Sequence, residues 1–217
     1  MFYNDFGSFK TRAFQLADLV NSSFITDDEL NNIANDVWRQ VYSDLIFIGD
    51  KFFLKTQNIT SKETRLDNLD NHETFFSLEG IYGVRNDIVT PFMRRSGTQK
   101  LSGNLYDIIG MSLYVYNTEN FDYIEMRYFP MPKELFVPDA QSQTVVTGSV
   151  MTDMPNNIFT QYLCYKVAIQ LKVKQGADAT GLSALANDMW ETYLQTLNRD
   201  NFGMVRIQNV YNNRGWR

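Results

Sequence analysis

Residues 25–46, ITDDELNNIANDVWRQVYSDLI, constrain the fold of this chain more than any other stretch. Apolar side chains recur there at intervals of three and four residues, which is the spacing of one face of an α-helix. Thr26 can cap the helix, and Glu29, three residues later, can reach back to the N–H of the cap. The pattern predicts an amphipathic helix over residues 27–47, with Asn31, Asn32 and Asn35 on the face opposite the apolar stripe.

Further helical patterns lie on either side of a central region of a different kind. The stretch FKTRAFQLADLV predicts a shorter helix whose inward residues are Ala13, Leu16, Ala17 and Val20. Residues 158–173 are apolar nearly all round, which predicts a central buried helix ended by Gly176. A last regular stripe follows over residues 182–197. Trp38 and Trp190 lie in the middle of their stripes, so both are expected to face the interior.

The central region, residues 51–150, has the pattern of strands. Short aromatic or β-branched runs alternate with turn residues. Ser112–Tyr116 and Phe121–Phe129 are interpreted as a β-hairpin linked by Asn117–Asn120. We therefore predict a mainly α fold with inserted β structure. Its expected parts are a four-helix bundle from residues 1–50 and 155–200, a β-rich insertion over 51–154, and an extended C-terminal arm over 201–217.

Net charge and cysteine content limit the functional classes to which this chain can belong. The formal net charge is −5, and a general nucleic-acid binder would need a basic face. The single cysteine, Cys164, excludes an intramolecular disulfide, and its apolar neighbours predict a buried thiol. The N-terminal residues lack the pattern of a signal peptide. No stretch approaches the roughly 18 apolar residues that span a membrane.

Residues typical of catalytic or metal sites are sparse. His72 is the one histidine, so neither a zinc site nor a Cys–His nucleophile pair fits a familiar spacing. Asp67, Asp70 and Glu73 lack the alternating ligands and the glycine of an EF-hand loop. The glycines form no phosphate-binding loop. We expect no enzyme, no metal site and no cofactor.

Two segments have both a functional and an ordinary interpretation. Arg94, Arg95 and Lys100 surround Gly97, and they form either a loop tip that contacts phosphate or an acidic partner, or a solvated hairpin tip. The C-terminal tail is either a frayed terminus or an arm that becomes ordered on a partner. Its apolar content favours the arm, and its arginines are typical interface anchors. The predicted interface residues are Phe202, Val205, Arg206, Ile207, Val210, Tyr211, Arg214, Trp216 and Arg217.

Several stretches together resemble one family. The run TRAFQLADLVNSSFITDDELNNIANDVWRQVYSDLI, followed by GDKFFLKTQNIT, resembles the opening of the head-to-tail adaptor proteins of tailed bacteriophages. These are also called connector, head-completion or ring proteins, and those of short-tailed and crAss-like phages are the most similar. FFSLEGIYGVRNDI, MRYFPMPKELF and LNRDNFGMVRIQNVY agree with the family in kind. The β region is larger than a minimal adaptor needs.

The resemblance implies a structural virion protein. Identical subunits, twelve to match the symmetry of the portal protein, would form a ring below the portal, extend the DNA channel and provide the surface for tail assembly. The implied partners are neighbouring subunits, the portal, and a further tail or nozzle protein, with no membrane. DNA would pass without specific binding, which suits an acidic chain. The implied location is the neck or tail of the virion, after synthesis in the host cytoplasm, with the C-terminal arm against the portal or a neighbouring subunit.

Two alternatives stand beside this hypothesis. The chain is a second ring, a tail-tube or a tail-hub protein, which is still structural but lies lower in the tail. Otherwise it is an unrelated cytosolic enzyme or binding module with a site in the β region. Mass in solution separates the classes, because a stable monomer with a ligand-filled pocket favours the last.

Overall fold

The computed structural model describes residues 6–20, 24–67, 69, 73–95, 103–135 and 154–212, with side chains from residue 7 to residue 197. The chain divides into a helical unit, residues 1–50 and 133–217, and a β unit, residues 51–132. Helices form 42% of the structure and strands 27%. The fold is mixed α/β, and the predicted mainly α fold built on a four-helix bundle is wrong. The central region forms two four-stranded sheets, so strands contribute too much of the fold for a mainly α class.

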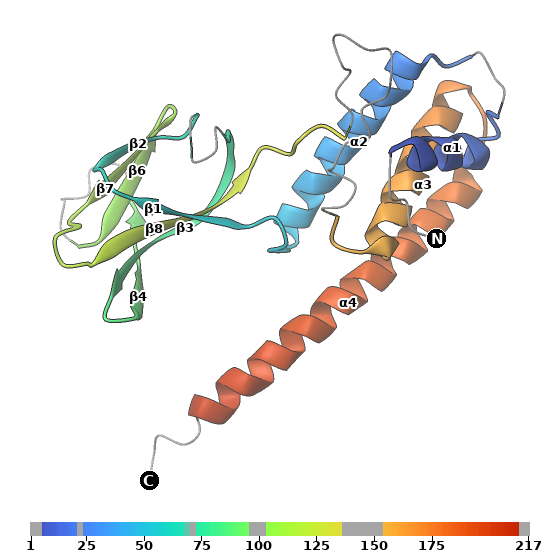
Figure 1. Cartoon of the computed structure of the whole chain (residues 1–217). Helices are drawn as coiled ribbons and strands as arrows, with labels where there is room; N and C mark the ends of the chain where they lie inside the picture. The colour runs from blue at the N-terminus through green and yellow to red at the C-terminus, as the bar shows by residue number, and fades with distance from the viewer. Residues whose placement is uncertain are drawn as a thin grey trace. The chain divides into compact units, whose positions relative to one another are not determined.

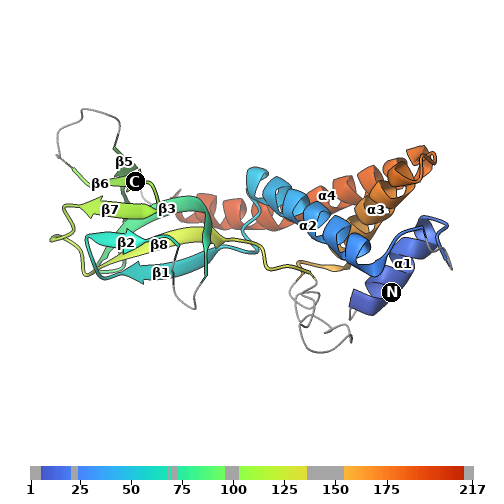
Figure 2. The ribbon, with the colours of Figure 1, turned by 90° about the horizontal axis from the view of Figure 1, so that it is seen from above.

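The helical unit is organised around one central helix. Its described helices are α1 (Phe6–Leu16), α2 (Asp27–Phe47), α3 (Asn157–Lys174) and α4 (Thr180–Asn212). α1, α2 and α4 each pack against α3, as Figures 1 and 2 show. α3 occupies this position because it is apolar nearly all round, and Phe159, Leu163 and Leu171 are fully buried. The prediction of a central buried helix is confirmed.

α2 begins where the sequence predicts. The hydroxyl of Thr26 accepts a hydrogen bond from the N–H of Glu29, 3.3 Å away. The carboxylate of Glu29 forms an ion pair with Lys174 of α3. The predicted apolar stripe is buried, but so are Asn31 and Asn35, each 7% exposed. The prediction that both asparagines lie on the solvent side is therefore wrong, because other residues cover that edge of the helix.

α1 follows the prediction except at its end. Ala13 and Ala17 are buried as expected. Val20, predicted to point inward, is 59% exposed. The helix ends at Leu16, and Asp18 adopts a positive φ of 59°. Since the chain has left the helix by then, Val20 no longer follows helical spacing.

The end of α3 and its cysteine agree with the prediction. Gly176 has a φ of +71°, and its N–H donates to the carbonyl of Val173 over 3.0 Å. This left-handed conformation ends many helices and favours glycine. Cys164 is 0% exposed, with Sγ 3.8 Å from the carbonyl oxygen of Phe9, so the prediction of a buried thiol is confirmed.

α4 is longer than the sequence indicates. The sequence predicts an extended arm over residues 201–217, and this is wrong for residues 201–212, where the backbone is helical; residues 213–217 lie outside the described residues. The apolar stripe does not continue past Leu197, and Gly203 has a low helix propensity, which conceals the helix in the sequence. At 1.5 Å per residue α4 spans about 50 Å and α3 about 27 Å. α4 therefore continues past the start of α3 (Figure 1).

The β unit consists of two four-stranded sheets. The first has the order β1–β8–β3–β4 and the second β2–β7–β6–β5. Neighbouring strands are antiparallel, except that β5 and β6 are parallel. The strands are β1 (Lys55–Ile59), β2 (Glu63–Arg65), β3 (Phe75–Arg85), β4 (Ile88–Pro91), β5 (Met93–Arg94), β6 (Leu105–Ile109), β7 (Ser112–Tyr116) and β8 (Tyr123–Pro130).

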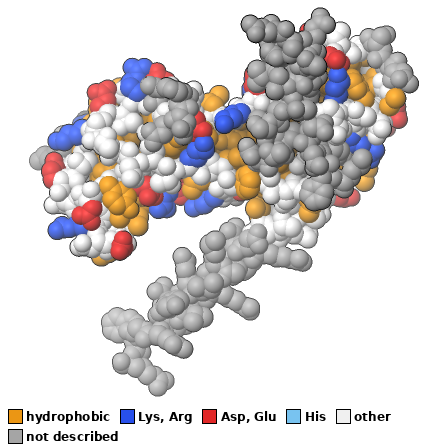
Figure 3. Space-filling view, in the orientation of Figure 1, with side chains coloured by type: hydrophobic (Ala, Val, Ile, Leu, Met, Phe, Trp, Pro, Cys, Tyr) orange, Lys and Arg blue, Asp and Glu red, His pale blue; other side chains and the backbone are white. Residues whose placement is uncertain are grey.

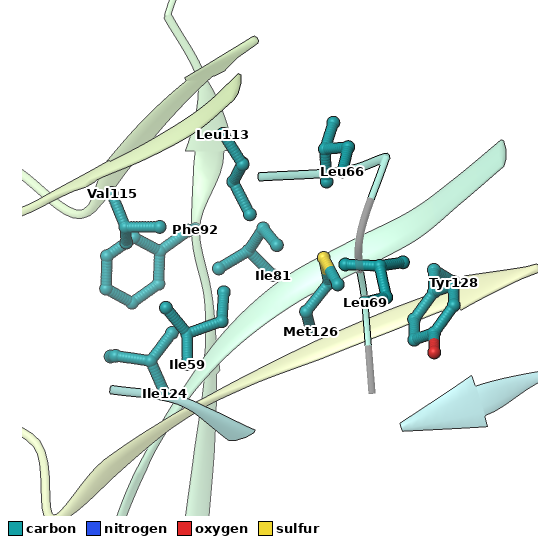
Figure 4. Packing of buried hydrophobic residues seen from close by; sticks show 10 residues of the cluster. All are labelled: Ile59, Leu66, Leu69, Ile81, Phe92, Leu113, Val115, Ile124, Met126 and Tyr128. Carbon is teal, nitrogen blue, oxygen red and sulfur yellow. The ribbon is translucent and has the colours of Figure 1, made fainter. Parts of the chain in front are cut away.

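A hydrophobic core lies between the two sheets. Alternate residues of β8, Ile124, Met126 and Tyr128, are buried there together with Leu113 and Val115 of β7 (Figure 4). This alternation is the period of a strand with one buried face. The remaining members of the cluster are Ile59, Leu66, Leu69, Ile81 and Phe92. The β unit thus has a core of its own.

The predicted hairpin between Ser112–Tyr116 and Phe121–Phe129 is wrong. β7 pairs with β2 and β6, whereas β8 pairs with β1 and β3. The Asn117–Asn120 segment therefore joins strands of different sheets. Tight hairpins occur instead at Asn86–Asp87 and Gly110–Met111, where positive φ angles provide the twist that such turns require.

Candidate functional site

The best-defined polar site of the helical unit lies on α2, where the segment Lys133–Leu135, here called the strap, is bound. The indole N–H of Trp38 donates to the carbonyl of Lys133 over 2.9 Å. The guanidinium of Arg39 donates to the carboxylate of Glu134 over 2.7 Å. The backbone N–H of Leu135 donates to Oδ1 of Asn35 over 2.8 Å. Each strap residue thus contacts α2, whereas the sequence predicts that the β insertion continues to residue 154.

The strap accounts for the burial of Asn35 on α2. Leu135 is 0% exposed and covers the edge of the helix that bears Asn35. A buried amide oxygen without a hydrogen bond would cost about 1–3 kcal/mol, and the N–H of Leu135 avoids that cost. The strap was not predicted from the sequence. The available signal was an asparagine pair four residues apart, Asn31 and Asn35, at the border of the apolar stripe, but the sequence does not indicate the partner.

A second contact connects α4 to the end of α2. The hydroxyl of Tyr193 donates to the carboxylate of Asp50. Both residues are buried, at 1% and 8% exposure. The N–H of Asp50 donates to the carbonyl of Leu45 over 3.0 Å, which fixes Asp50 just past the helix end. The ring of Tyr193 lies 5.5 Å from that of Phe159. At Tyr193, α4 therefore passes both the end of α2 and the start of α3.

Aromatic rings connect these two contacts. Trp38 packs edge-on against Tyr42 and Phe159, with centroid distances of 5.4 and 6.2 Å. Trp190 stacks on Tyr162 and Tyr193 at 4.8 and 5.8 Å. Trp38 is 2% exposed, which confirms that it faces the interior, whereas Trp190 is only partly buried.

Burial changes the acidity of two tyrosines in this region. Burial raises the pKa of Tyr162 to about 12, and the nearby Asp44 carboxylate adds to the effect. The pKa of Tyr193 is also raised, first by burial and then by its hydrogen bond to Asp50. Both hydroxyls stay protonated at neutral pH, so the hydroxyl of Tyr193 is available as the donor to Asp50.

The solvent side of α2 forms a continuous face. Apart from Asp27 in the first turn, the exposed residues of α2 lie on this face, here called the outer face: Asp28, Asn32, Asp36, Arg39, Gln40, Ser43 and Phe47. At 100° per residue they fall within an arc of about 120°. Phe47 is 92% exposed at the C-terminal end of this face. Phenylalanine buries much apolar area when a partner covers it, so the outer face offers an apolar anchor beside polar and acidic side chains.

The predicted interface residues of the tail fall largely outside the described side chains. Phe202, Val205, Arg206, Ile207, Val210 and Tyr211 belong to the helical backbone of α4. Arg214, Trp216 and Arg217 lie outside the described residues. The structure thus places the first six on a helix continuous with the one that Tyr193 fixes.

The basic loop tip is only partly described. Arg94 is exposed on β5, and Arg95 is partly buried next to it. The N–H of Arg95 donates to the carbonyl of Tyr106 over 2.7 Å, and among the described residues its buried Nε has no hydrogen-bond partner. Lys100 lies outside the described residues. On the face shown in Figure 3, basic and acidic side chains of the β unit are interspersed.

Asp67 and Glu73, considered above as metal ligands, are paired separately. Asp67 binds Arg65, and this hydrogen bond lowers the pKa of the Asp67 carboxyl. Glu73 binds Lys55 and accepts a hydrogen bond from the hydroxyl of Tyr128 over 3.4 Å. Asp70 and His72 lie outside the described residues. Within the described ranges, no three His, Cys, Asp or Glu side chains gather as ligands for a metal ion.

Comparison with protein families and curated proteins identifies no relative of this chain. No protein-family model and no curated protein matches this chain. None of the helices in the described ranges has the length and apolar character needed to cross a bilayer.

Proposed function

We propose that this chain is a structural, non-enzymatic subunit of a bacteriophage head-to-tail connector. Twelve identical copies form a ring below the portal protein, continue the DNA channel and provide the attachment surface for a tail or nozzle protein. The chain resides in the neck of the virion. Its acidic balance supports this role, because a channel that passes DNA should bind the phosphate backbone weakly.

The observation that carries the proposal is the overhang of α4, here defined as residues 198–212. Tyr193 lies level with the end of α2 and the start of α3, and from there the helix continues to Asn212, about 28 Å further. A helix of this length is marginal in water without tertiary contacts. A protein partner would stabilise the overhang, and a ring assembled on a portal supplies such partners around its whole circumference.

Co-expression with the portal protein of the same genome tests the proposal. We expect the two proteins to co-purify with equal numbers of subunits by native mass spectrometry. Electron microscopy should show an additional ring below the portal. A chain that forms neither a portal complex nor a closed oligomer would contradict the proposal.

A truncated chain tests the part assigned to the tail. Deleting residues 203–217 should abolish co-purification, because it removes most of the overhang. Val173→Asp provides a matched control, since Val173 is 58% exposed at the far end of α3, and it should bind as the wild type does. Unchanged portal binding together with unchanged ring formation after the deletion would show that the tail is only a frayed terminus.

A further inference from the structure

We infer that the outer face of α2, with Phe47 as its apolar anchor, receives the C-terminal residues 198–217 of a second copy of this chain. The inference rests on the proposed function and specifies the contact between neighbouring subunits of the ring.

The direction of α4 excludes its own α2 as the binding surface. α2 and α3 are antiparallel, because Glu29 near the start of α2 binds Lys174 at the end of α3, and Trp38 contacts Phe159 at the start of α3. α3 and α4 are also antiparallel, since Phe159 contacts Tyr193. α4 therefore runs parallel to α2.

A continuous helix that passes the end of α2 cannot return to it. The contact between Tyr193 and Asp50 marks where α4 leaves the end of α2, and the helical backbone continues to Asn212. The overhang thus moves away from the outer face of its own chain by about 28 Å. The overhang of another copy is free of this constraint and can reach the face.

Charge favours this occupant. The outer face carries two acidic residues, Asp28 and Asp36, and one basic residue, Arg39. Arg39 already binds Asp36 at 3.0 Å and Glu134 at 2.7 Å, and within the described residues no cation pairs with Asp28 or Asp44. Residues 198–217 contain four arginines and one aspartate. The incoming segment is basic where the receiving helix is acidic, which favours encounter and orientation.

Exposed apolar residues on α2 and apolar residues in the tail can pack against each other. Phe47 is 92% exposed and Ile48, the next residue, is 40% exposed. The tail contributes Phe, Val, Ile, Tyr and Trp residues to a partner. A few buried aromatic residues dominate the energy of most interfaces, so Phe47 is the residue whose loss should weaken the contact most.

The contact joins two different surfaces of the same chain. Such heterologous contacts form a closed ring when the rotation between subunits closes, and a filament when it does not. The α2–tail contact is therefore of the type that a ring of identical subunits requires.

Self-association of the full-length chain tests the inference. Sedimentation equilibrium up to about 200 μM covers the range of weak contacts. Phe47→Asp should weaken self-association at least about tenfold, as loss of an anchor residue does. Val173→Asp makes the same change at another exposed apolar position of the helical unit, and it should leave the association constant unchanged.

Disulfide cross-linking tests the partner and the direction. A Phe47→Cys chain mixed with a Tyr211→Cys chain should form the mixed dimer under mild oxidation, whereas Val173→Cys mixed with Tyr211→Cys should not. Cys164 is buried and does not interfere. A single chain that carries both new cysteines should form intermolecular rather than intramolecular disulfides.

Each contrary result is informative. If the wild type associates but Phe47→Asp has no effect, or if the bond forms within one chain, the inference is wrong while the ring proposal stands. A wild-type chain that stays monomeric and yields no cross-link also overturns the inference. The ring proposal fails separately, when the chain forms no complex with the portal.

Discussion

Trp38 combines packing and hydrogen bonding at one position. Its ring is 2% exposed against Tyr42 and Phe159, and its N–H binds the carbonyl of Lys133. We expect Trp38→Ala to lower the free energy of unfolding by about 3–5 kcal/mol, as large cavities in cores do. Trp190 is partly exposed, so Trp190→Ala should cost less. Urea denaturation followed by circular dichroism measures both, and equal costs would contradict the difference in burial.

Two buried tyrosines should make the helical unit sensitive to alkali. The pKa of Tyr162 is raised to about 12 by burial, and that of Tyr193 is raised by burial and by Asp50. The unfolded value is about 10. When the folded pKa is the higher one, the stability is fully present below the unfolded pKa and is lost as pH rises toward the folded pKa. For each of the two tyrosines, the free energy of unfolding should therefore fall by about 1.4 kcal/mol per pH unit above about pH 10.

Tyr162→Phe separates one of these contributions. The variant should lose stability less steeply between about pH 10 and 11.5, by about 1.4 kcal/mol per pH unit, because one titrating hydroxyl is gone. Urea midpoints measured across this range give the slope, and measurements at pH 7 correct for any packing change. An unchanged slope would show that Tyr162 does not titrate differently in the folded and unfolded chains.

Residues whose environment is local could be predicted from the sequence. Thr26 caps α2 by accepting a hydrogen bond from the N–H of Glu29, only three positions later. Trp38 is buried because it lies in the apolar stripe of the same helix. Asn35 and Asp50 could not be predicted, since each depends on a residue about a hundred positions or more away in the chain. For a polar residue at the border of an apolar stripe, the periodicity of the sequence does not indicate which distant residue it hydrogen-bonds.

At the scale of elements, the end of α3 offers a test of backbone conformation. Gly176 has a φ of +71° and nothing lies within 4 Å of an added Cβ. Gly176→Ala should therefore cost about 1 kcal/mol through the left-handed conformation alone. Gly181, in the first turn of α4, also has open space around it. Gly181→Ala should be neutral or stabilising by up to about 1 kcal/mol, because it restricts the unfolded chain.

Thermal unfolding of the two glycine variants tests whether the φ angle of Gly176 determines the effect of an added Cβ. The changes in melting temperature should have opposite signs, or Gly181→Ala should show none. If both variants lose stability equally, the cause is lost space or a different conformation rather than the φ angle of Gly176.

Elements are better predicted than their partners. The helical period located α2, and the apolar run of residues 158–173 located α3. The pairing of β8 was missed because sequence proximity favoured a hairpin with β7, whereas β8 joins β1 and β3. Nearness in sequence does not decide pairing when a chain alternates between two sheets. The overhang of α4 was missed for a related reason, since its helix does not continue the apolar stripe.

At the scale of the whole molecule, the fold class depends on whether the central region can bury enough apolar side chains to form a hydrophobic core of its own. The sequence suggested an excursion between halves of a bundle. The residues that overturn this are Ile81, Leu113, Val115, Ile124 and Met126, which close a core between two sheets. The proposed site could not be predicted, because the outer face of α2 consists of the residues that the described part of the helical unit leaves exposed, including Phe47.

The β unit should fold when separated from the helices. Its core lies within residues 51–132. β1 and β8, the first and last strands, pair in register from Lys55 opposite Tyr128 to Ile59 opposite Ile124, so both chain ends emerge at neighbouring strands. Independent cores with adjacent ends are the features of insertable domains. We expect the isolated segment to unfold in one cooperative transition and to give dispersed amide resonances.

A core variant and a control make this prediction decisive. Met126 is 0% exposed at the centre of the cluster, so Met126→Ala should lower the free energy of unfolding of the isolated segment by about 2–5 kcal/mol. Thr56 is exposed on β1, and Thr56→Ser should change it by less than about 0.5 kcal/mol. A segment without a cooperative transition, or one in which both variants behave alike, would mean that the β unit needs the helical unit to fold.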